Sequence, residues 1–407
     1  MGKRNPESSP SGQRVAILGA ARTPIGKFGG SLRSVPAVSL GAVALKAALE
    51  RSGVAPDAVR QVVFGHCIQA GAGQNPARQV LRAAGIPDTS GAATVNMVCG
   101  SGMQAIIFGA AQIRAGDFGV VAVGGMESMS MAPFLIPSAA RWGLRYGART
   151  VDDSMLRDSL LDAYAEHEHM GLTGERIARK YGLTRAEVDA FALRSHLAAS
   201  RGTREGVFTK EIEPVPQSLV AQGPGLDRDE GPRPDTTLEG LARLKPSFLP
   251  NGLLTAGNSS QLADGAAALI LAGEAEASRS RVPPLAWIHS SYVSGVSPPR
   301  VMESPIPTVR AHLKQTGFHP SDFDRVEHNE AFSSASIAVQ RALGFTDGQF
   351  NVNGGAVALG HPIGASGARI VVTLAYELLR SQGSRGLATL CMGGGNGLSL
   401  ILERSTH

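Results

Sequence analysis

One cysteine of this chain lies at a position where its thiol could act as a nucleophile. Cys99 follows the apolar run Ala93 to Val98, which predicts a strand. It precedes a Gly-Ser-Gly turn and a helix predicted over Met103 to Ala115. This order places the thiol beside the positive end of a helix, where the macrodipole and free N–H groups stabilise a thiolate. A thiolate is a nucleophile, although a lone cysteine is equally typical of a buried core.

Three polar clusters in the last part of the chain could supply partners for that thiol. They are His328 to Phe332 at a predicted strand end, Gly360 to Gly364 with His361 inside, and Cys391 before the glycine run Gly393 to Gly397. Taken singly, each has a structural explanation. His361 could be a buried histidine whose hydrogen bonds are all made, Asn329 a turn or cap residue, and Cys391 a core cysteine. The glycine run suggests a nucleotide loop only weakly, because a predicted strand and not a helix follows it.

Recurring segments indicate that the chain contains two copies of one α/β unit. A helix end, a glycine stop and a proline occur at the same spacing in Ala48 to Pro56 and in His312 to Pro320. Val95-Asn96 and Val352-Asn353 each lead to a turn of small residues and then to a helix, the second predicted over Ala368 to Arg380. The period is far longer than that of a solenoid, so we interpret it as a duplication.

The duplication gives the thiol a specific partner. His361 occupies the turn of the second copy that corresponds to the Cys99 turn of the first. Equivalent turns of a duplicated parallel sheet can meet near its pseudo-twofold axis. We therefore expect Cys99 and His361 to form a Cys–His pair in which the imidazole activates the thiol.

The elements that must position these residues follow from hydrophobic periodicity. Apolar runs alternate with helical patterns, which predicts an α/β layer with a largely parallel sheet. The predicted strands of the first copy are Arg14 to Ala20, Val59 to Gly65, Ala93 to Val98 and Val120 to Val123, and its predicted helices are Ser39 to Arg51, Pro76 to Ala84 and Met103 to Ala115.

The sequence changes character between the copies, over residues 126–254. Helical patterns occur at Glu175 to Tyr181 and at Arg185 to Arg201, with Thr184 as the expected N-cap of the second. The run Pro214 to Thr237 is rich in proline, glycine and aspartate. We interpret this stretch as an inserted region of helices and loops that carries substrate contacts or serves oligomerisation.

The composition argues against several classes of protein. The 407 residues predict two or three domains, and 43% hydrophobic with 18% charged residues describe a globular protein with a large core. The net charge of +5 is spread along the chain without a lysine-arginine block, which argues against nucleic-acid binding but suits a small polyanionic ligand. No apolar run has membrane-spanning length.

Cysteine usage indicates a reducing compartment. Cys67, Cys99 and Cys391 are the three cysteines, an odd and sparse set that argues against a disulfide framework. The absence of CxxC and HxxxH pairs makes a structural zinc site an unfavourable interpretation. The polar segment Met1 to Gln13 lacks the apolar core of a secretory signal, and we expect a disordered tail there.

The motifs taken together resemble those of the thiolase family, most closely its acetyl-CoA acetyltransferase branch. The resemblance covers essentially everything after about Val15. It rests on Asn96 to Gly102, Gly124 to Ser130, Asn329 to Phe332, Gly360 to Gly364 and Cys391 to Gly395.

The resemblance implies a duplicated βαβαβαββ thiolase fold in the layer order α-β-α-β-α. The N-terminal half would span residues 1–130, completed by about 259–283. An inserted loop and coenzyme A-binding region would span 131–258, and the C-terminal half 284–407.

The resemblance also implies a mechanism. Cys99 would take an acyl group from a coenzyme A thioester after His361 withdraws its proton, and Cys391 would remove a proton from the methyl carbon of a second acetyl-CoA. One oxyanion hole would come from the His361 ring and a water held by Asn329, and the other from the backbone N–H groups of Cys99 and Gly393.

Contacts to the substrate and its coenzyme A carrier are implied as well, at His169, Met170, Arg233, Phe248, Ala256, Ser260, Ala331 and Phe332. A solvated surface position remains the alternative for Arg233. The sequence departs from the family pattern at Gln261, Ala263 and Asn396, which leaves local loop geometry and acyl-chain preference open.

The expected reaction is reversible condensation of two acetyl-CoA to acetoacetyl-CoA, and His169-Met170 favours this short-chain branch. The enzyme would need no cofactor and no metal, and would be a cytoplasmic homotetramer, a dimer of dimers, without nucleic-acid or membrane partners. The alternatives are a degradative 3-ketoacyl-CoA thiolase of fatty-acid β-oxidation, a ketosynthase-like enzyme and a non-catalytic acyl-CoA or lipid carrier. A ketosynthase would have a second histidine in place of Cys391, and a carrier would lack catalytic residues.

Overall fold

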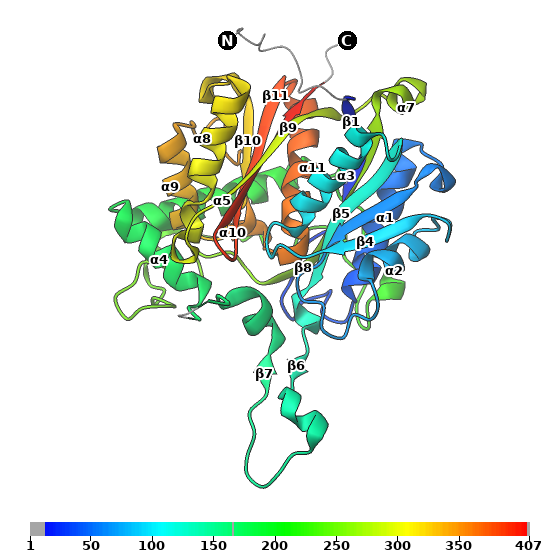
Figure 1. The fold of residues 1–407 in the computed structure, drawn as a ribbon. Coiled ribbons are helices and arrows are strands. Elements are labelled where there is room, and N and C mark those ends of the chain that lie inside the picture. Colours follow the sequence, from blue (N-terminus) through cyan, green and yellow to red (C-terminus); the bar gives the residue numbers. More distant parts are fainter. Residues whose placement is uncertain (1–12, 165–166, 405–407) are drawn as a thin grey trace.

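The fold is built on one mixed β-sheet with helices on its outer faces and between its two halves (Figure 1). The computed structural model describes residues 13–164 and 167–404, so the expected tail Met1 to Gln13 lies outside the described residues except for Gln13. The strand order is β10-β11-β12-β9-β1-β8-β5-β3-β4, with β2 beside β8. The strands are β1 (Val15–Arg22), β2 (Gly26–Lys27), β3 (Gln61–Gly65), β4 (Gly91–Val95), β5 (Val120–Ser128), β8 (Ala263–Gly273), β9 (Ala286–Gly295), β10 (Arg325–His328), β11 (Arg385–Met392) and β12 (Asn396–Glu403).

Strand pairing is parallel near the two ends of the sheet and antiparallel in its centre. β3 runs parallel to β4 and β5, and β10 runs parallel to β11. β8 is antiparallel to β1 and β5, and β9 is antiparallel to β1 and β12. The sequence predicted a largely parallel sheet from the alternation of strands and helices. That alternation does not reach β8, which follows the insertion, or β12, which a short hairpin joins antiparallel to β11.

The helices complete five layers in the expected order α-β-α-β-α. α3 and α11 pack together between the inward faces of the two half-sheets and share one apolar core with them. α1 and α2 cover the outer face of the first half, and α8 and α9 cover that of the second. The helices are α1 (Ala37–Ser52), α2 (Pro76–Ala83), α3 (Ser101–Ala115), α4 (Met170–Lys180), α5 (Arg185–Arg204), α6 (Leu238–Ala242), α7 (Glu274–Arg279), α8 (Pro305–Thr316), α9 (Ser333–Leu343), α10 (Ala356–Leu359) and α11 (Ile363–Ser381).

Small residues let α3 and α11 begin almost in contact. A Cβ atom on Gly102 would lie 2.7 Å from the backbone nitrogen of Ala368, and one on Gly367 would lie 2.5 Å from that of Met103. Only glycine permits such an approach of two backbones. Because the two candidate turns immediately precede these helices, the crossing brings them together.

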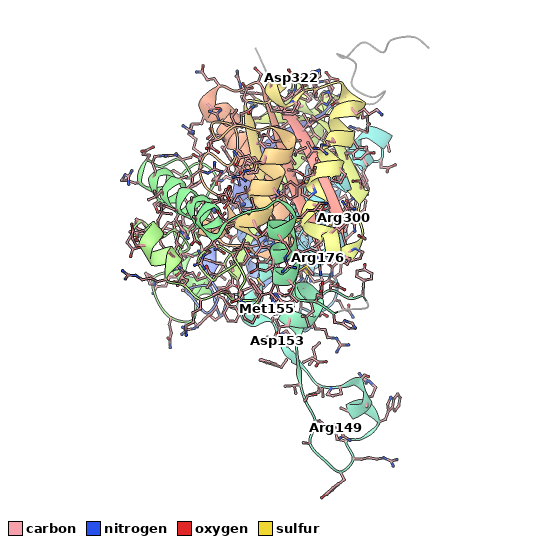
Figure 2. The ribbon with its side chains drawn as sticks, turned by 90° about the vertical axis from the view of Figure 1, so that its left-hand side faces the viewer. Arg149, Asp153, Met155, Arg176, Arg300 and Asp322 are labelled. Carbon is pink, nitrogen blue, oxygen red and sulfur yellow. The ribbon has the colours of Figure 1, made fainter. Side chains whose placement is uncertain are left out.

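The insertion supplies helices and a projecting arm. α5 begins at the predicted N-cap Thr184, whose side chain and that of Glu187 form a capping box. Residues 134–153 leave the body as an arm whose ends pair as β6 (Phe134–Leu135) and β7 (Asp152–Asp153). Figures 1 and 2 show the arm extending away from the layers, with Arg149 far from the body. No helix of the described chain is long and apolar enough to cross a membrane.

Three element boundaries near the candidate site differ from the sequence prediction. α3 begins at Ser101, so the last two residues of the predicted Gly-Ser-Gly turn belong to the helix. α11 begins at Ile363, so residues 364–367, predicted as a turn, form its first helical turn. β4 ends at Val95, before the predicted Val98. The backbone turns there because the Asn96 side chain accepts a hydrogen bond from the Val98 N–H at 3.0 Å.

Candidate functional site

Cys99, His361 and Cys391 reach one chamber from three elements. Cys99 precedes α3, His361 precedes α11, and Cys391 lies near the end of β11. The chamber has a volume of about 50 Å³, and all three side chains line it. The expected contact between Cys99 and His361 is present, since Nε2 of His361 lies 3.3 Å from Sγ of Cys99.

Hydrogen bonds fix which nitrogen of His361 faces the thiol. Nδ1 lies 2.6 Å from the Ser366 hydroxyl, which itself donates to the Pro362 carbonyl at 2.9 Å. The hydroxyl has one proton, so it must accept a hydrogen bond from Nδ1–H. Nε2 therefore carries a lone pair directed at Cys99, which is the arrangement a general base needs.

The turn that holds Cys99 is strained at the residue before it. Val98 has φ +49°, a left-handed conformation that is rare for a β-branched residue. Ser101 secures the turn, since its hydroxyl donates to the Val98 carbonyl at 2.7 Å and accepts from the Met97 N–H at 2.9 Å. Strain of this kind persists where the surroundings over-determine the backbone, and it is common at functional sites.

The expected thiolate at Cys99 is a prediction that the resting site does not support. Burial raises the pKa of Cys99 to about 12, against the opposing effect of the backbone N–H groups of Gly393 and Cys99. Burial also lowers the pKa of His361 to about 3, with the Arg369 charge adding to the effect. Desolvation penalises both charged forms and outweighs the helix terminus. The resting pair is a neutral thiol beside a neutral imidazole.

Cys391 is a second buried thiol at the same chamber. Its thiol donates to the Met302 sulfur, with Sγ and Sδ 3.7 Å apart. Burial raises the pKa of Cys391 to about 12, and the nearby Cys99 adds to the rise. A thiolate formed there would be a stronger base than an ordinary cysteine thiolate.

Asn329 approaches the pair from the end of β10. Its side-chain nitrogen lies 3.3 Å from Nε2 of His361, and it is fully buried. Its Oδ1 has no hydrogen-bond partner among the described residues. A buried amide oxygen without a partner is suited to hold a water molecule.

Several of the residues predicted to contact the substrate or its oxyanion gather at this chamber. Met170, Ser260, Ala331, Phe332 and Gly393 line it together with the two thiols and the imidazole. The stacked rings of His169 and Phe248, 5.1 Å apart, continue this wall, and Phe248 meets Phe332 edge to face at 5.9 Å.

Two predicted contacts lie at the surface, outside the chamber lining. Ala256 is exposed, and so is Arg233, whose backbone N–H donates to His196 at 3.2 Å. Their exposure suits the far end of a long ligand and equally suits solvated positions.

Sequence reasoning missed several residues that shape the site. Leu160, Val301 and Met302 wall the chamber, and only the path of the insertion and of the loop before α8 brings them there. Ser366 had a usable signal, because it follows His361 by five residues in the turn predicted before the Ala368 helix. No group of histidine, cysteine, aspartate and glutamate among the described residues is arranged to hold a metal ion.

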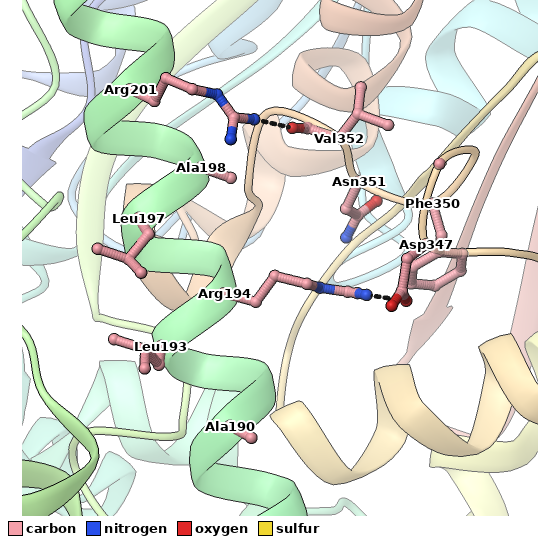
Figure 3. Close-up of a pocket in the computed structure, with 11 residues that line it drawn as sticks. Ala190, Leu193, Arg194, Leu197, Ala198, Arg201, Asp347, Phe350, Asn351 and Val352 are labelled. Carbon is pink, nitrogen blue, oxygen red and sulfur yellow. Dashed lines mark hydrogen bonds and ion pairs between the residues drawn. The ribbon is translucent and has the colours of Figure 1, made fainter.

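A larger hollow elsewhere on the molecule offers less chemistry. It has a volume of about 590 Å³ and lies between α5 and residues 347–352. Figure 3 shows Arg194 paired with Asp347 there, and Arg201 donating to the Val352 carbonyl. Its lining contains no cysteine or histidine, so the small chamber is the better candidate for covalent chemistry.

The pKa values of the resting pair predict how Cys99 reacts with an alkylating agent. The pair stays neutral between about pH 3 and about pH 12. Alkylation by iodoacetamide should therefore rise about tenfold per pH unit from neutral pH upward, because the thiolate fraction does so below the pKa. Peptide mapping of the modified protein would measure this rate at Cys99, with Cys99→Ser as the unlabelled control. A rate that is constant from pH 5 to pH 9 would contradict the neutral pair and indicate a thiolate–imidazolium pair.

Comparisons with known proteins match this chain over nearly its full length. The family model for the thiolase N-terminal domain matches residues 15–275, and that for the thiolase C-terminal domain matches residues 282–404. An acetyl-CoA acetyltransferase of Pseudomonas aeruginosa is 48% identical over 96% of this chain and 100% of its own length. One from Escherichia coli is 45% identical over 96% of this chain and 99% of its own length.

A solved structure agrees in fold as well. The crystal structure of the Bacillus anthracis acetyl-CoA acetyltransferase superposes with a TM-score of 0.94 at 41% identity, covering 98% of this chain and 100% of the other.

Proposed function

The chain belongs to the thiolase family of acyltransferases, and we propose that it catalyses the reversible Claisen condensation of two acetyl-CoA to acetoacetyl-CoA and coenzyme A. The observation that carries this proposal is the meeting of two thiols and one imidazole at a single small chamber. The names of the relatives, each an acetyl-CoA acetyltransferase, support the same reaction.

The first half of the proposed reaction transfers an acetyl group to Cys99. Nε2 of His361 takes the thiol proton as the sulfur attacks the thioester carbonyl, because a thiol with a pKa of about 12 needs a base at the moment of attack. The departing coenzyme A thiolate takes the proton of Cys391. The products are acetyl-Cys99, free coenzyme A, the Cys391 thiolate and the His361 imidazolium.

The second half forms the carbon–carbon bond. The Cys391 thiolate removes a proton from the methyl carbon of a second acetyl-CoA, and its raised pKa makes it a better base for this carbon acid. The carbanion attacks acetyl-Cys99, and the departing Cys99 thiolate recovers its proton from His361. Both thiols and the imidazole return to their resting state. The same steps in reverse give thiolysis.

Both halves place negative charge on a thioester oxygen. We propose that the backbone N–H groups of Cys99 and Gly393 stabilise one oxyanion. The His361 ring and a water held by Oδ1 of Asn329 would stabilise the other. The position of the Gly393 N–H beside the Cys99 sulfur, where it lowers the thiol pKa, supports the first assignment.

Coenzyme A would reach the chamber along the insertion. In this proposal, His169, Phe248, Ala256 and Ser260 contact the pantetheine, and the exposed Arg233 meets the nucleotide end. The aromatic wall from His169 to Phe332 supports this path. Coenzyme A thioesters are the substrates, and no cofactor or metal takes part in the proposed steps.

The size of the chamber supports a short acyl group. Its volume of about 50 Å³ is room for about three to five water molecules at about 10–15 Å³ each. Met302 and Leu160 are among the side chains that wall it, and in this proposal they limit the length of the acyl chain. We therefore prefer acetoacetyl-CoA over the long 3-ketoacyl-CoA of a degradative enzyme.

A chain-length profile tests this preference. We expect kcat/KM for thiolysis to be at least about tenfold higher for acetoacetyl-CoA than for 3-ketohexadecanoyl-CoA, since unaccommodated methylenes cost about 1–3 kcal/mol each. Met302→Ala should lengthen the chamber and so reduce the difference in kcat/KM between the two substrates. If the wild-type enzyme prefers the longer substrate, the short-chain proposal is wrong and the degradative 3-ketoacyl-CoA thiolase is the better interpretation.

We also propose that the protein is a cytoplasmic homotetramer, assembled as a dimer of dimers. The arm carries exposed apolar residues, with Trp142 86% and Tyr146 103% exposed, which is unfavourable in a monomer. β4 ends the sheet with partly exposed residues and offers an edge for a second contact. Two separate surfaces are what a dimer of dimers requires.

Light scattering with size-exclusion chromatography tests the assembly. The double variant Trp142→Ser and Tyr146→Ser should have half the mass of the wild-type particle, because the arm contact is lost and the other contact remains. Leu379→Ser, an exposed apolar position on α11, is the matched control and should keep the wild-type mass. A wild-type monomer, or a double variant of unchanged mass, would contradict the proposed role of the arm.

A further inference from the structure

A buried carboxylate joins the two halves of the molecule beneath the chamber. Glu127 lies on β5 with no exposed surface. Its Oε2 accepts hydrogen bonds from the backbone N–H groups of Gly364 at 2.9 Å and Cys67 at 3.2 Å. Its Oε1 accepts one from the Ile68 N–H at 3.3 Å and lies 3.3 Å from Nε2 of His66. A buried carboxylate is tolerated because donors surround it in this way.

One of these bonds reaches the element that carries the imidazole. Gly364 is the second residue of α11 and follows His361 by three residues. Its N–H is one of the free donors of the first helical turn, where a carboxylate is favourable. Glu127 therefore holds the start of α11 against the end of β5.

The other bonds reach the turn that carries the nucleophile. The Cys67 peptide donates to Glu127 through its N–H, and its carbonyl accepts from the Asn96 side chain at 3.1 Å. Oδ1 of Asn96 in turn accepts the N–H of Val98, the residue before Cys99. A continuous chain of hydrogen bonds thus runs from the carboxylate to the strained turn.

Backbone packing around the carboxylate is too tight for the two halves to adjust independently. A Cβ atom on Gly364 would lie 2.6 Å from the Met126 carbonyl oxygen and 2.9 Å from Oε2 of Glu127. One on Gly125 would lie 2.2 Å from the Gly364 carbonyl oxygen. Moving the carboxylate would shift the start of α11 relative to the Cys99 turn. A displacement of about 1 Å between reacting groups can cost about a hundredfold in rate.

We propose that Glu127 is a positioning residue that sets the distance between the His361 imidazole and the Cys99 thiol. The inference rests on the proposed acyl transfer through these two groups. Glu127 does not line the chamber, so it acts through the two turns and not on the substrate. Among the described residues, His66 is the only side chain that makes a polar contact with the Glu127 carboxylate, through Nε2.

The variant Glu127→Gln tests this role. Its amide presents N–H groups to backbone donors and leaves at least one of them without an acceptor. We expect the single-turnover rate of Cys99 acetylation, followed by mass spectrometry, to fall about 10–100-fold, the usual loss when a residue that orients a functional side chain is removed. The affinity for coenzyme A, measured by calorimetry, should stay within about twofold, because the insertion that binds it is untouched.

A matched carboxylate separates positioning from general destabilisation. Glu377 is also buried, and it binds three partners, Arg325, Asn353 and Arg380, near the far end of α11. Glu377→Gln should lower the melting temperature while its folded fraction acetylates Cys99 at the wild-type rate. Glu127→Asp, which keeps the charge, should recover part of the rate. If Glu127→Gln does not fold, Glu127→Asp and Glu377→Asp give the same comparison.

The outcomes distinguish this inference from the proposed function. Folded Glu127 variants that acetylate Cys99 at the wild-type rate would overturn the positioning role and leave the reaction intact. Equal rate losses in the Glu127 and Glu377 variants would also overturn it. A wild-type protein that never acetylates Cys99 would overturn the proposed function itself.

Discussion

Replacing Cys99 with alanine is expected to lower turnover by ~10⁴-fold or more, the scale seen when a covalent nucleophile is removed. The physical reason is that the remaining groups cannot form an acyl-enzyme. Cys391 contacts Met302, whereas the thiol of Cys99 lies within hydrogen-bond distance of Nε2 of His361. The measurement is loss of acetoacetyl-CoA absorbance in the presence of coenzyme A.

A serine at position 99 tests how much of the activity depends on the sulfur atom. Cys99→Ser keeps the hydrogen bond to His361 but presents a weaker nucleophile, so some acetylation should remain while turnover falls strongly. Cys67→Ala is the labelling control, because the third cysteine is buried and acetylation should stay on Cys99. Full turnover in Cys99→Ala would refute covalent catalysis at this residue and leave a carrier on the same fold as the better interpretation.

Replacing Cys391 with serine is expected to separate the two halves of the reaction. Condensation should fall by about 10²–10⁴-fold, the usual contribution of a general acid–base group. Acetylation of Cys99 should persist at a reduced rate, because the Cys99–His361 pair is intact while the departing coenzyme A thiolate loses the Cys391 proton. Mass spectrometry after mixing with acetyl-CoA should therefore find one acetyl group on the protein, while acetoacetyl-CoA formation is nearly absent.

Exchange of the methyl protons gives an independent measure of the same step. Wild-type enzyme should exchange deuterium from solvent into the methyl group of acetyl-CoA, and Cys391→Ser should not. Condensation at the wild-type rate in this variant would show that another base removes the methyl proton. His361 would then be the candidate for that base. Complete absence of acetyl-Cys99 even after long incubation, together with loss of condensation, would indicate damage to the site and would contradict Cys99 as the acetylated thiol in this variant.

The two predictions depend on different parts of the same desolvated environment. Burial raises the pKa of both thiols to about 12, which makes each a poor spontaneous nucleophile and a strong base once deprotonated. The proposed site uses the first property at Cys99, where the imidazole must assist. It uses the second at Cys391, where a carbon acid must lose its proton. One apolar chamber can thus serve both steps because the thiols differ in their neighbours.

Much of the fold was readable from local patterns. The strand–turn–helix order around Cys99, the helix from Arg185 and its Thr184 cap follow from periodicity and capping chemistry, and the structure confirms them. The repeat of two turns predicted that Cys99 and His361 meet, since equivalent turns of a duplicated unit are related by symmetry.

The sequence by itself therefore determined the fold class, the pairing of Cys99 with His361 and the family, because these depend on residue types, spacing and motifs that survive in one dimension. Only the tertiary structure decided the state of the pair. A local helix terminus predicted a thiolate, but desolvation by segments distant in the chain leaves a neutral thiol and imidazole. The tertiary structure also decided that Leu160 and Met302 wall the chamber. It likewise decided that Glu127 accepts a hydrogen bond from the start of α11. They arise where separate segments pack together, and burial and packing distances have no counterpart in the order of residues.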